Sequence, residues 1–401
     1  RLVGSEMCIR DRSTGFITTP LTWGLFPSHL LLPALPVIEE TFAVSNDVAQ
    51  LTLSLSMLAI AVGTLFYGPL SDKYGRKPIM LIGIVITLLG SLFCYVADSI
   101  FLLILGRFIQ AFGGAVGLVL ARAIVRDVYG PEEAARVIAT LVMVMVVLPM
   151  MSPALGGELM QLYGFESVFI VIAVASAIAF VFLFFQLPET LAKPVPFEGL
   201  KSTFITFKTL FASRAFCGYA FCVTFVSVVF FSFISAAPEI MVSVLNRPPT
   251  EYGYYFILIP AGFMSGNYVA RHFGGEISID SMISIGASIG VFGIVVAIIL
   301  QILGLSTPLA LVLPIAFAVF GNGITLPNAQ AAAINEFPQY AGTASGLTGF
   351  LQMGVSSVAA QVVALIFNET VYPLLCMMLV ASIISLITFR WGVLNFRKAP
   401  V

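Results

Sequence analysis

The chain consists of long apolar runs separated by short polar segments. A helix that crosses a bilayer needs about 20 consecutive, mostly apolar residues. Such runs predict twelve transmembrane helices at approximately 15–37, 49–69, 78–97, 100–124, 134–157, 165–187, 213–236, 252–271, 281–303, 307–328, 341–366 and 370–391. The pattern therefore predicts an all-α integral membrane protein.

Composition supports this class. The chain is 59% hydrophobic and 10% charged, with a mean hydropathy of +1.04, whereas a soluble domain carries about 25% charged residues. The net charge of −1 gives no sign of a nucleic-acid partner, and the bilayer is the partner that the apolar runs require. The five cysteines fit no metal-binding spacing, so we expect no cofactor, and we expect a monomer.

Positive charges predict the orientation, because lysine and arginine favour cytoplasmic loops. With a cytoplasmic amino terminus, the outer side receives only Arg247. The inner side receives Lys73, Arg76, Lys77, Arg122, Arg126, Arg136, Lys193, Lys201, Lys208, Arg214, Arg271, Arg390, Arg397 and Lys398. We therefore expect a bacterial inner-membrane protein with both termini in the cytoplasm.

The twelve predicted helices divide into two sets of six. Residues 1–12 look like a non-native sequence scar and are left out of the fold. Residues 13–187 are expected to form one bundle and residues 213–401 the other, related by an axis along the membrane normal. The segment 188–212, with three prolines and three lysines, is expected to be a cytoplasmic linker.

The most specific motif is the run Gly68-Pro-Leu-Ser-Asp72-Lys-Tyr-Gly75-Arg76-Lys between the second and third predicted helices. It resembles the signature loop G-x-L-S-D-[KR]-x-G-R-[KR] of the major facilitator superfamily of secondary transporters. The resemblance implies the major facilitator fold, with two pseudo-symmetric six-helix bundles.

The chemistry of this loop predicts a cytoplasmic latch. Gly68 and Gly75 permit close approach and a sharp turn. Asp72 can face the positive amino end of the eleventh helix, and Arg76 can pair with Asp127 at the inner end of the fourth. The alternative is a solvated loop that only sets orientation.

The fourth predicted helix carries Arg107, followed one turn later by Gln110. An arginine at membrane depth is costly and suggests a functional site. The run from Gly106 to Gly114 resembles the helix-4 motif of the superfamily, in which the arginine tunes a nearby proton site. The alternative is that Arg107 extends toward the outer headgroups. Gln110 is a candidate for the substrate cavity.

The fifth predicted helix contains Pro149 and Pro153 and ends in Gly156 and Gly157. This run resembles the antiporter motif of the superfamily, although the leading glycines of the general pattern are absent. It is more similar to the A-P-x-x-A-P-x-x-G-G variant of the Bcr/CflA-type bicyclomycin and chloramphenicol exporters. The resemblance extends from about residue 16 to 395 and implies export of drugs in exchange for protons.

The first helix departs from that subfamily. His29 stands where its D-x-Y-L-P-A motif has an aspartate that is a proton and cation site. Histidine titrates near neutral pH and can carry the proton, but it offers no negative charge to a cationic drug. A hydrogen-bonded structural histidine is the alternative.

Further polar residues lie at or near membrane depth. Glu158 and Glu239, near the outer ends of their helices, are either cavity carboxylates that exchange protons or solvated helix ends. Asn328 and Gln352 either bond neighbouring helices or contact the substrate in the cavity.

Together these features predict a secondary transporter that exports small amphipathic molecules or drugs in exchange for protons by alternating access. A facilitator or a dedicated metabolite transporter on the same fold remains the alternative. The chain lacks the H-E-x-x-H and G-x-S-x-G motifs of enzymes and the G-x-x-x-x-G-K-[ST] loop of ATPases. The sequence therefore predicts that the protein is not an enzyme. It does not identify the substrate.

Overall fold

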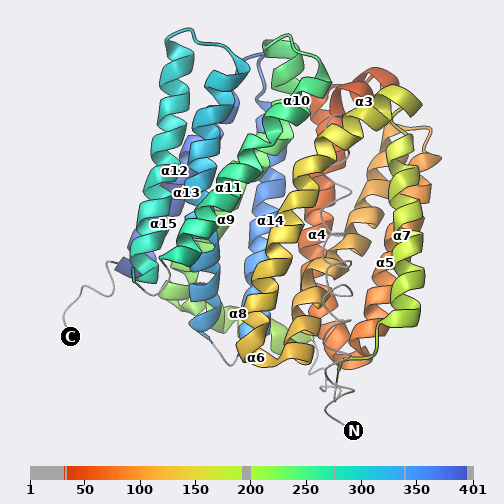
Figure 1. Cartoon of the computed structure of the whole chain (residues 1–401), viewed down its shortest axis with the longest axis vertical. Coiled ribbons are helices and arrows are strands. Elements are labelled where there is room, and N and C mark those ends of the chain that lie inside the picture. Colours follow the sequence, from red (N-terminus) through yellow and green to blue (C-terminus); the bar gives the residue numbers. More distant parts are fainter. Residues whose placement is uncertain (1–30, 32–33, 192–199, 274–275, 338–339, 395–401) are drawn as a thin grey trace.

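The computed structural model describes residues 31, 34–191, 200–273, 276–337 and 340–394 of the chain. The long elements of this part are helices that stand side by side, as Figure 1 shows. Nine of the described helices are long and apolar enough to cross a membrane. The first predicted helix, apart from its last few residues, lies outside the described residues.

The helices follow one another with short connections. The first half contains α3 (Leu35–Phe42), α4 (Asn46–Tyr74), α5 (Arg76–Tyr95), α6 (Ile100–Tyr163) and α7 (Ser167–Gln186). Helix α8 (Leu200–Ala212) lies within the predicted linker and runs across the bottom of Figure 1. The second half contains α9 (Arg214–Glu239), η2 (Ile240–Val244), α10 (Pro249–Phe256), α11 (Leu258–His272), α12 (Ile279–Ile302), α13 (Pro308–Asn335), α14 (Ala341–Leu365), α15 (Tyr372–Phe389) and η4 (Arg390–Leu394).

Element α6 contains two of the predicted membrane helices, 100–124 and 134–157, as one helical segment. At about 1.5 Å per residue, a straight helix of this length would greatly exceed the bilayer. Leu103 near its start and Met160 near its end nevertheless contact the same apolar cluster. The element therefore doubles back, and its two arms act as separate membrane crossings.

The predicted helix 252–271 is divided into α10 and α11 at Ile257. Pro260 explains the break, because proline has no amide hydrogen to donate to the carbonyl four residues earlier. That residue is Phe256, where α10 ends. Neither piece is long enough to span the bilayer alone, but together they cover the predicted crossing.

The order of helix packing in the first half recurs in the second. Helix α6 packs against both α4 and α5, and α13 packs in the same way against α11 and α12. Helix α7 packs on α5 as α15 packs on α12. Helices α4, α5 and α7 thus have counterparts six crossings later, as does the first arm of α6, as expected for two pseudo-symmetric bundles.

Glycine permits the closest of these contacts. A Cβ atom on Gly113 of α6 would lie 2.5 Å from the backbone nitrogen of Thr87 on α5. In membrane proteins, where lipid is as apolar as the helices, such small residues let neighbouring helices pack tightly.

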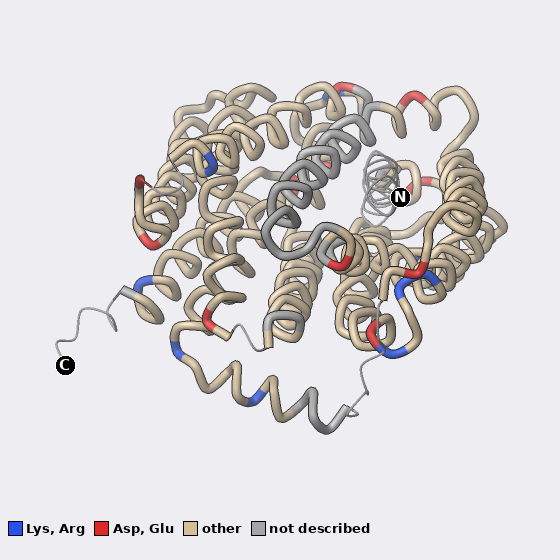
Figure 2. Tube along the Cα trace, turned by 60° about the horizontal axis from the view of Figure 1, so that its bottom comes forward, with Lys and Arg blue, Asp and Glu red and all other residues tan. Residues whose placement is uncertain are grey.

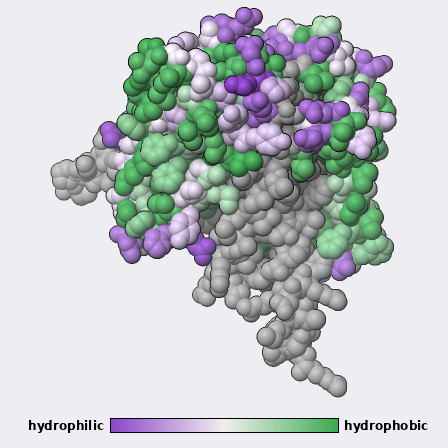
Figure 3. Space-filling view, turned by 45° about the horizontal axis from the view of Figure 1, so that its top comes forward, coloured by the Kyte–Doolittle hydropathy of each residue, from purple (hydrophilic) through white to green (hydrophobic). Residues whose placement is uncertain are grey.

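The surface has the character of a protein embedded in lipid. Many large apolar side chains point outward from the middle of the helices, among them Phe292 at 61% exposure. Figure 3 shows apolar flanks below a more polar cap at the end where α4 begins.

Positive charges gather at the opposite end of the bundle. In Figure 2, which brings this end forward, lysine and arginine segments lie where α4 meets α5 and along α8. Lys73, Arg76 and Lys77 surround the α4–α5 junction, and Lys208 lies on α8. We call this end of the bundle the signature end and the other the far end.

Candidate functional site

The signature loop is a tight junction in which the single residue Gly75 connects α4 to α5. Its φ of +101° lies in the region that favours glycine. The chain therefore reverses direction within one residue, and Arg76 begins the next helix already buried at 8% exposure.

Arg76 is the centre of the polar contacts in this loop. Its Nε donates to Asp127 Oδ2 of α6 at 3.0 Å, and its Nη1 donates to Ser71 Oγ at 2.6 Å. Nη1 also forms an ion pair with Asp72 Oδ1 at 2.6 Å. The structure thus brings Arg76 and Asp127 together across two helices, at the place where the sequence analysis expects a pair.

Asp72 forms an ion pair within its own loop. Its ion-pair partner among the described residues is Arg76, and its side chain is 47% exposed. Contact with the start of α14 stays a prediction. Gly68 faces α6, where an added Cβ would lie 3.8 Å from Val119.

Sequence reasoning missed Glu189, which follows α7 and completes this loop. Its Oε1 accepts the backbone amide of Arg76 at 2.9 Å, and its Oε2 accepts that of Lys77 at 3.2 Å. A detectable signal existed, because Gly75 has no side chain that could cap the first amides of α5. That signal indicates the need for an acceptor, not which residue supplies it.

Arg107 lies in the interior of the first half at 1% exposure. Its Nη1 donates to Gln110 Oε1, and Gln110 Nε2 donates to Ser91 Oγ of α5 at 2.7 Å. The Nε and Nη2 atoms of Arg107 have no hydrogen-bond partner within the described part of the chain. A buried guanidinium is therefore only partly satisfied.

The burial of Arg107 bears on two expectations from the sequence. Its guanidinium is enclosed by protein, so it does not extend to the outer headgroups. Gln110 is 0% exposed and bonded to Arg107 and Ser91. Its proposed place in the substrate cavity stays a prediction.

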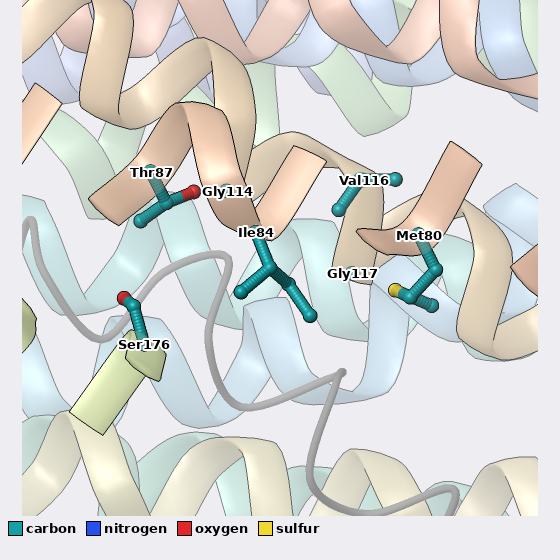
Figure 4. Close-up of a pocket in the computed structure, with 7 residues that line it drawn as sticks. All are labelled: Met80, Ile84, Thr87, Gly114, Val116, Gly117 and Ser176. Carbon is teal, nitrogen blue, oxygen red and sulfur yellow. The ribbon is translucent and has the colours of Figure 1, made fainter. Parts of the chain in front are cut away.

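A small cavity lies between α5, α6 and α7. Figure 4 shows Thr87 and Ser176 among its lining residues, with the rest apolar or glycine. The Ser176 hydroxyl is buried and has no hydrogen-bond partner among the residues that the structure describes. The space suits about one water molecule and is far too small for a drug.

Two candidate carboxylates have different environments. Glu158 is exposed near the end of α6, whereas Glu239 is partly buried at the end of α9. Beside Glu239, on α3, lies Glu39, whose carboxyl accepts a hydrogen bond from Asn46 Nδ2 at 2.7 Å. Burial, and then the charge of Glu239, raise the pKa of Glu39 to about 7, while the Asn46 hydrogen bond opposes the rise.

The remaining candidates are distributed over several elements. Gly156 and Gly157 of α6 are buried, whereas the side chains of Pro149 and Pro153 lie outside the described part, as does His29. Asn328 donates to the carbonyl of Ile324 at 2.8 Å, within its own helix. Gln352 of α14 is partly buried. The structure brings none of these described residues onto Arg107.

The architecture defines the class first: a multi-pass helical membrane protein with two bundles of repeated packing order. The sequence profile of the Major Facilitator Superfamily matches residues 15–360. The chain therefore belongs to the Major Facilitator Superfamily, and it is a transporter rather than an enzyme.

Individual relatives refine the comparison. The chain is 28% identical over 367 residues to the bicyclomycin resistance protein homolog of Haemophilus influenzae, covering 91% of this chain and 92% of the relative. It is 28% identical over 348 residues to multidrug resistance protein D of Escherichia coli, covering 86% of each. A solved bacterial homolog of the human lysosomal transporter Spinster, in an inward-facing and unoccupied conformation, has a similar fold. Its TM-score is 0.73 at 16% identity, over 97% of both chains.

Proposed function

We propose that this transporter exports small amphipathic molecules or drugs in exchange for protons, by alternating access. The observation that carries the proposal is the buried guanidinium of Arg107, which the described residues satisfy only in part. Such a charge in a membrane helix costs several kcal/mol, on the order of 3, and packing alone gives no reason to keep it. A fixed positive charge that lowers the proton affinity of a neighbouring group is a reason. The names of the relatives support drug substrates.

The proposed orientation has the signature end in the cytoplasm. The described lysines and arginines near this end obey the positive-inside rule. Both termini are then cytoplasmic, and the protein resides as a monomer in the inner membrane. Residues 13–187 and 213–401 are the two moving bundles, and 188–212 the linker between them.

In the proposed cycle, the structure represents a state that is closed on the outside. Between described residues, hydrogen bonds from one half to the other occur at the far end, in the first turns of α4. At the signature end, Arg76 bonds within its own half. When that end closes, the half-exposed Asp72 reaches the amino end of α14 and completes the latch with Gly68, Gly75, Arg76 and Asp127.

Protons and substrate are assigned to different groups. His29, Arg107, Glu158 and Glu239 are the proposed proton-coupling residues. Gln110, Asn328 and Gln352 are the proposed cavity residues. The helix-5 motif of Pro149, Pro153, Gly156 and Gly157 is proposed to prevent proton leak.

The test uses inverted membrane vesicles with an acidic interior. Chloramphenicol, bicyclomycin and a cationic dye are added in turn while a pH-sensitive dye reports the gradient. We expect at least one compound to dissipate the gradient with the wild-type protein but not with Arg107→Ala or empty-vector vesicles. Full antiport by Arg107→Ala would contradict the proposed role of Arg107.

His29 specifically favours a second candidate, a facilitator or dedicated metabolite transporter. It replaces the carboxylate expected in the exporter subfamily, so the first helix lacks that acidic proton site. Uptake that ignores the pH gradient, together with no gradient dissipation by any compound, would support this alternative. Loss of antiport in His29→Ala would instead support proton coupling through the histidine.

A further inference from the structure

The far end of the bundle is held shut by side chains from both halves. Ser54 Oγ of α4 donates to Gln361 Oε1 of α14 at 2.7 Å, and Gln361 Nε2 donates to the Asp47 carbonyl at 2.8 Å. Ser357 Oγ also donates to the Ser54 carbonyl. We call the contact formed by Asp47, Gln50, Ser54, Ser235, Ser357 and Gln361 the outer seal.

Apolar packing reinforces the outer seal. Leu53 and Met57 of α4 are 5% and 2% exposed and belong to the apolar cluster of the second half. Neutral hydrogen bonds and apolar contacts have no pH dependence of their own. Any response of the seal to protons must therefore come from charged groups next to it.

Helix geometry identifies where those groups meet. Gln50 Nε2 donates to Ser235 Oγ of α9, and both residues are 2% exposed. Residues four apart share a helix face. One turn further out from this contact, α4 presents Asn46 and α9 presents Glu239.

Glu39 lies at the same depth along the bundle as Asn46 and Glu239. Its carboxyl is held by Asn46 Nδ2 at 2.7 Å, and its helix α3, at the top of Figure 1, packs against α9. The described groups that act on Glu39 are the carboxylates of Glu239 and Asp47 and the amide of Asn46, none of which is positive. Two partly buried carboxyls from helices of different halves, α3 and α9, thus lie close enough to influence each other electrostatically beside the outer seal.

Burial disfavours ionisation of Glu39, and the charge of Glu239 adds repulsion, so Glu39 binds a proton more tightly while the two halves are together. In a protein whose halves can move apart, separation of the halves also relieves the repulsion between the two carboxylates. We propose that Glu39 is a coupling residue of the transport cycle: a proton on Glu39, beside Glu239, keeps the outer seal closed, and loss of this proton opens the seal.

The sign of the pH dependence follows from where the proton binds more tightly. In the closed state the pKa of Glu39 is raised from 4.5 to about 7, and separation of the halves returns it toward its ordinary value. Closure is therefore favoured progressively as the pH falls from about 7 to about 4.5, and the repulsion favours opening above about 7. An acidic outer compartment would stabilise the inward-facing state. The coupling role rests on the proposed proton-driven function, whereas the response of the seal to pH does not.

The experiment measures the seal directly. Val96 at the end of α5 and Leu303 at the end of α12 are exposed turn residues of the two halves at the far end. Cysteines at these positions, with the five native cysteines replaced, carry spin labels in nanodiscs without substrate or gradient. We expect the short-distance population to rise about tenfold relative to the long one between pH 8.5 and pH 5.5.

The variants decide which groups are responsible. Glu39→Gln keeps an acceptor for Asn46 but no charge, so we expect the short distance at every pH. Glu239→Gln removes the repulsion and should keep the seal closed to higher pH. The control is Glu40→Gln, an exposed acid on the same helix, which should keep the wild-type curve.

Each outcome of the experiment either supports or contradicts the proposal. A wild-type distance that ignores pH, or a pH curve unchanged in both Glu39→Gln and Glu239→Gln, would overturn the proposal. Helical circular dichroism and a monodisperse elution profile establish that each variant is folded. A pH-dependent seal in a protein without proton antiport would overturn the proposed function but not the seal. Proton antiport by a protein whose outer seal does not respond to pH would overturn the proposed pH response of the seal but not the proposed function.

Discussion

Glu189 Oε1 accepts the backbone amide of Arg76 at 2.9 Å, so a residue beyond the end of α7 caps the start of α5. Gly75 makes room for this contact, because a Cβ at that position would lie 2.5 Å from Glu189 Oε2. The glycine therefore serves both the turn and the cap. The same carboxylate, near the positive end of α5, ties the first residues of the linker region to the signature loop.

Removing this cap should loosen the loop. Glu189→Ala leaves the amides of Arg76 and Lys77 without their acceptor, and loss of a helix cap costs about 1 kcal/mol. We expect a lower melting temperature in detergent and slower transport. Thr190→Val is the matched control, since the Thr190 hydroxyl has no partner in the described structure. Equal melting temperatures for Glu189→Ala and wild type would refute the capping role.

The ion pair between Arg76 and Asp127 can be separated from the proposed latch of Asp72. Arg76 is 10% exposed and Asp127 22%, so their coupling is only partly screened by solvent. A double-mutant cycle of Arg76→Ala and Asp127→Ala should give a coupling energy of about 1 kcal/mol. The measurement is thermal or denaturant unfolding of the four proteins.

Asp72→Asn should behave differently in the same assays. Its side chain is 47% exposed, so stability should change little, whereas transport should fall if Asp72 closes the latch. Normal transport by Asp72→Asn would mean that its negative charge has no role in the cycle.

The fold was accessible from sequence because its main signals are local. Runs of apolar residues place α5, α7 and α12 within a few residues of their observed ends, since lipid requires long apolar helices. The pairing of Arg76 with Asp127 was also predicted, because the signature loop and the inner end of the fourth helix must lie at the same membrane face. The break before Pro260 is also a local effect, because the proline is visible in the sequence and removes one backbone hydrogen bond.

Contacts between distant segments were less accessible. Gln361 meets Ser54 across 307 positions, and nothing in either local sequence indicates the other. The electrostatic influence of Glu239 on Glu39 likewise depends on how the two halves pack together. Such contacts belong to one conformation of the transporter rather than to its fold.

Close packing around the hydrogen-bonded residues Arg107, Gln110 and Ser91 predicts that two glycine-to-alanine substitutions differ sharply in their effect on stability. In Gly90→Ala, the new Cβ would lie 2.4 Å from the backbone nitrogen of Gln110, so α5 and α6 must separate. Overpacking of this kind costs about 1–3 kcal/mol and would displace the partner of Arg107. Gly290→Ala on α12 is the control, because its Cβ meets nothing closer than 3.3 Å. Expression and thermal stability of the two variants should rank Gly90→Ala well below Gly290→Ala.

Substitutions of Arg107 can separate its effect on the stability of the protein from its effect on transport. Its guanidinium is buried at 1% exposure, and the described part of the chain gives two of its nitrogens no partner, so those residues compensate its desolvation poorly. Arg107→Met keeps much of the volume without the charge, and we expect a melting temperature equal to or above that of wild type. Proton-coupled transport should nevertheless fall by more than about tenfold, because the charge that tunes the proton site is gone. Arg107→Lys, which keeps the charge, should retain more transport than Arg107→Met. A large loss of stability in Arg107→Met, with transport per folded molecule unchanged, would show instead that the arginine holds the bundle together through Gln110 and Ser91.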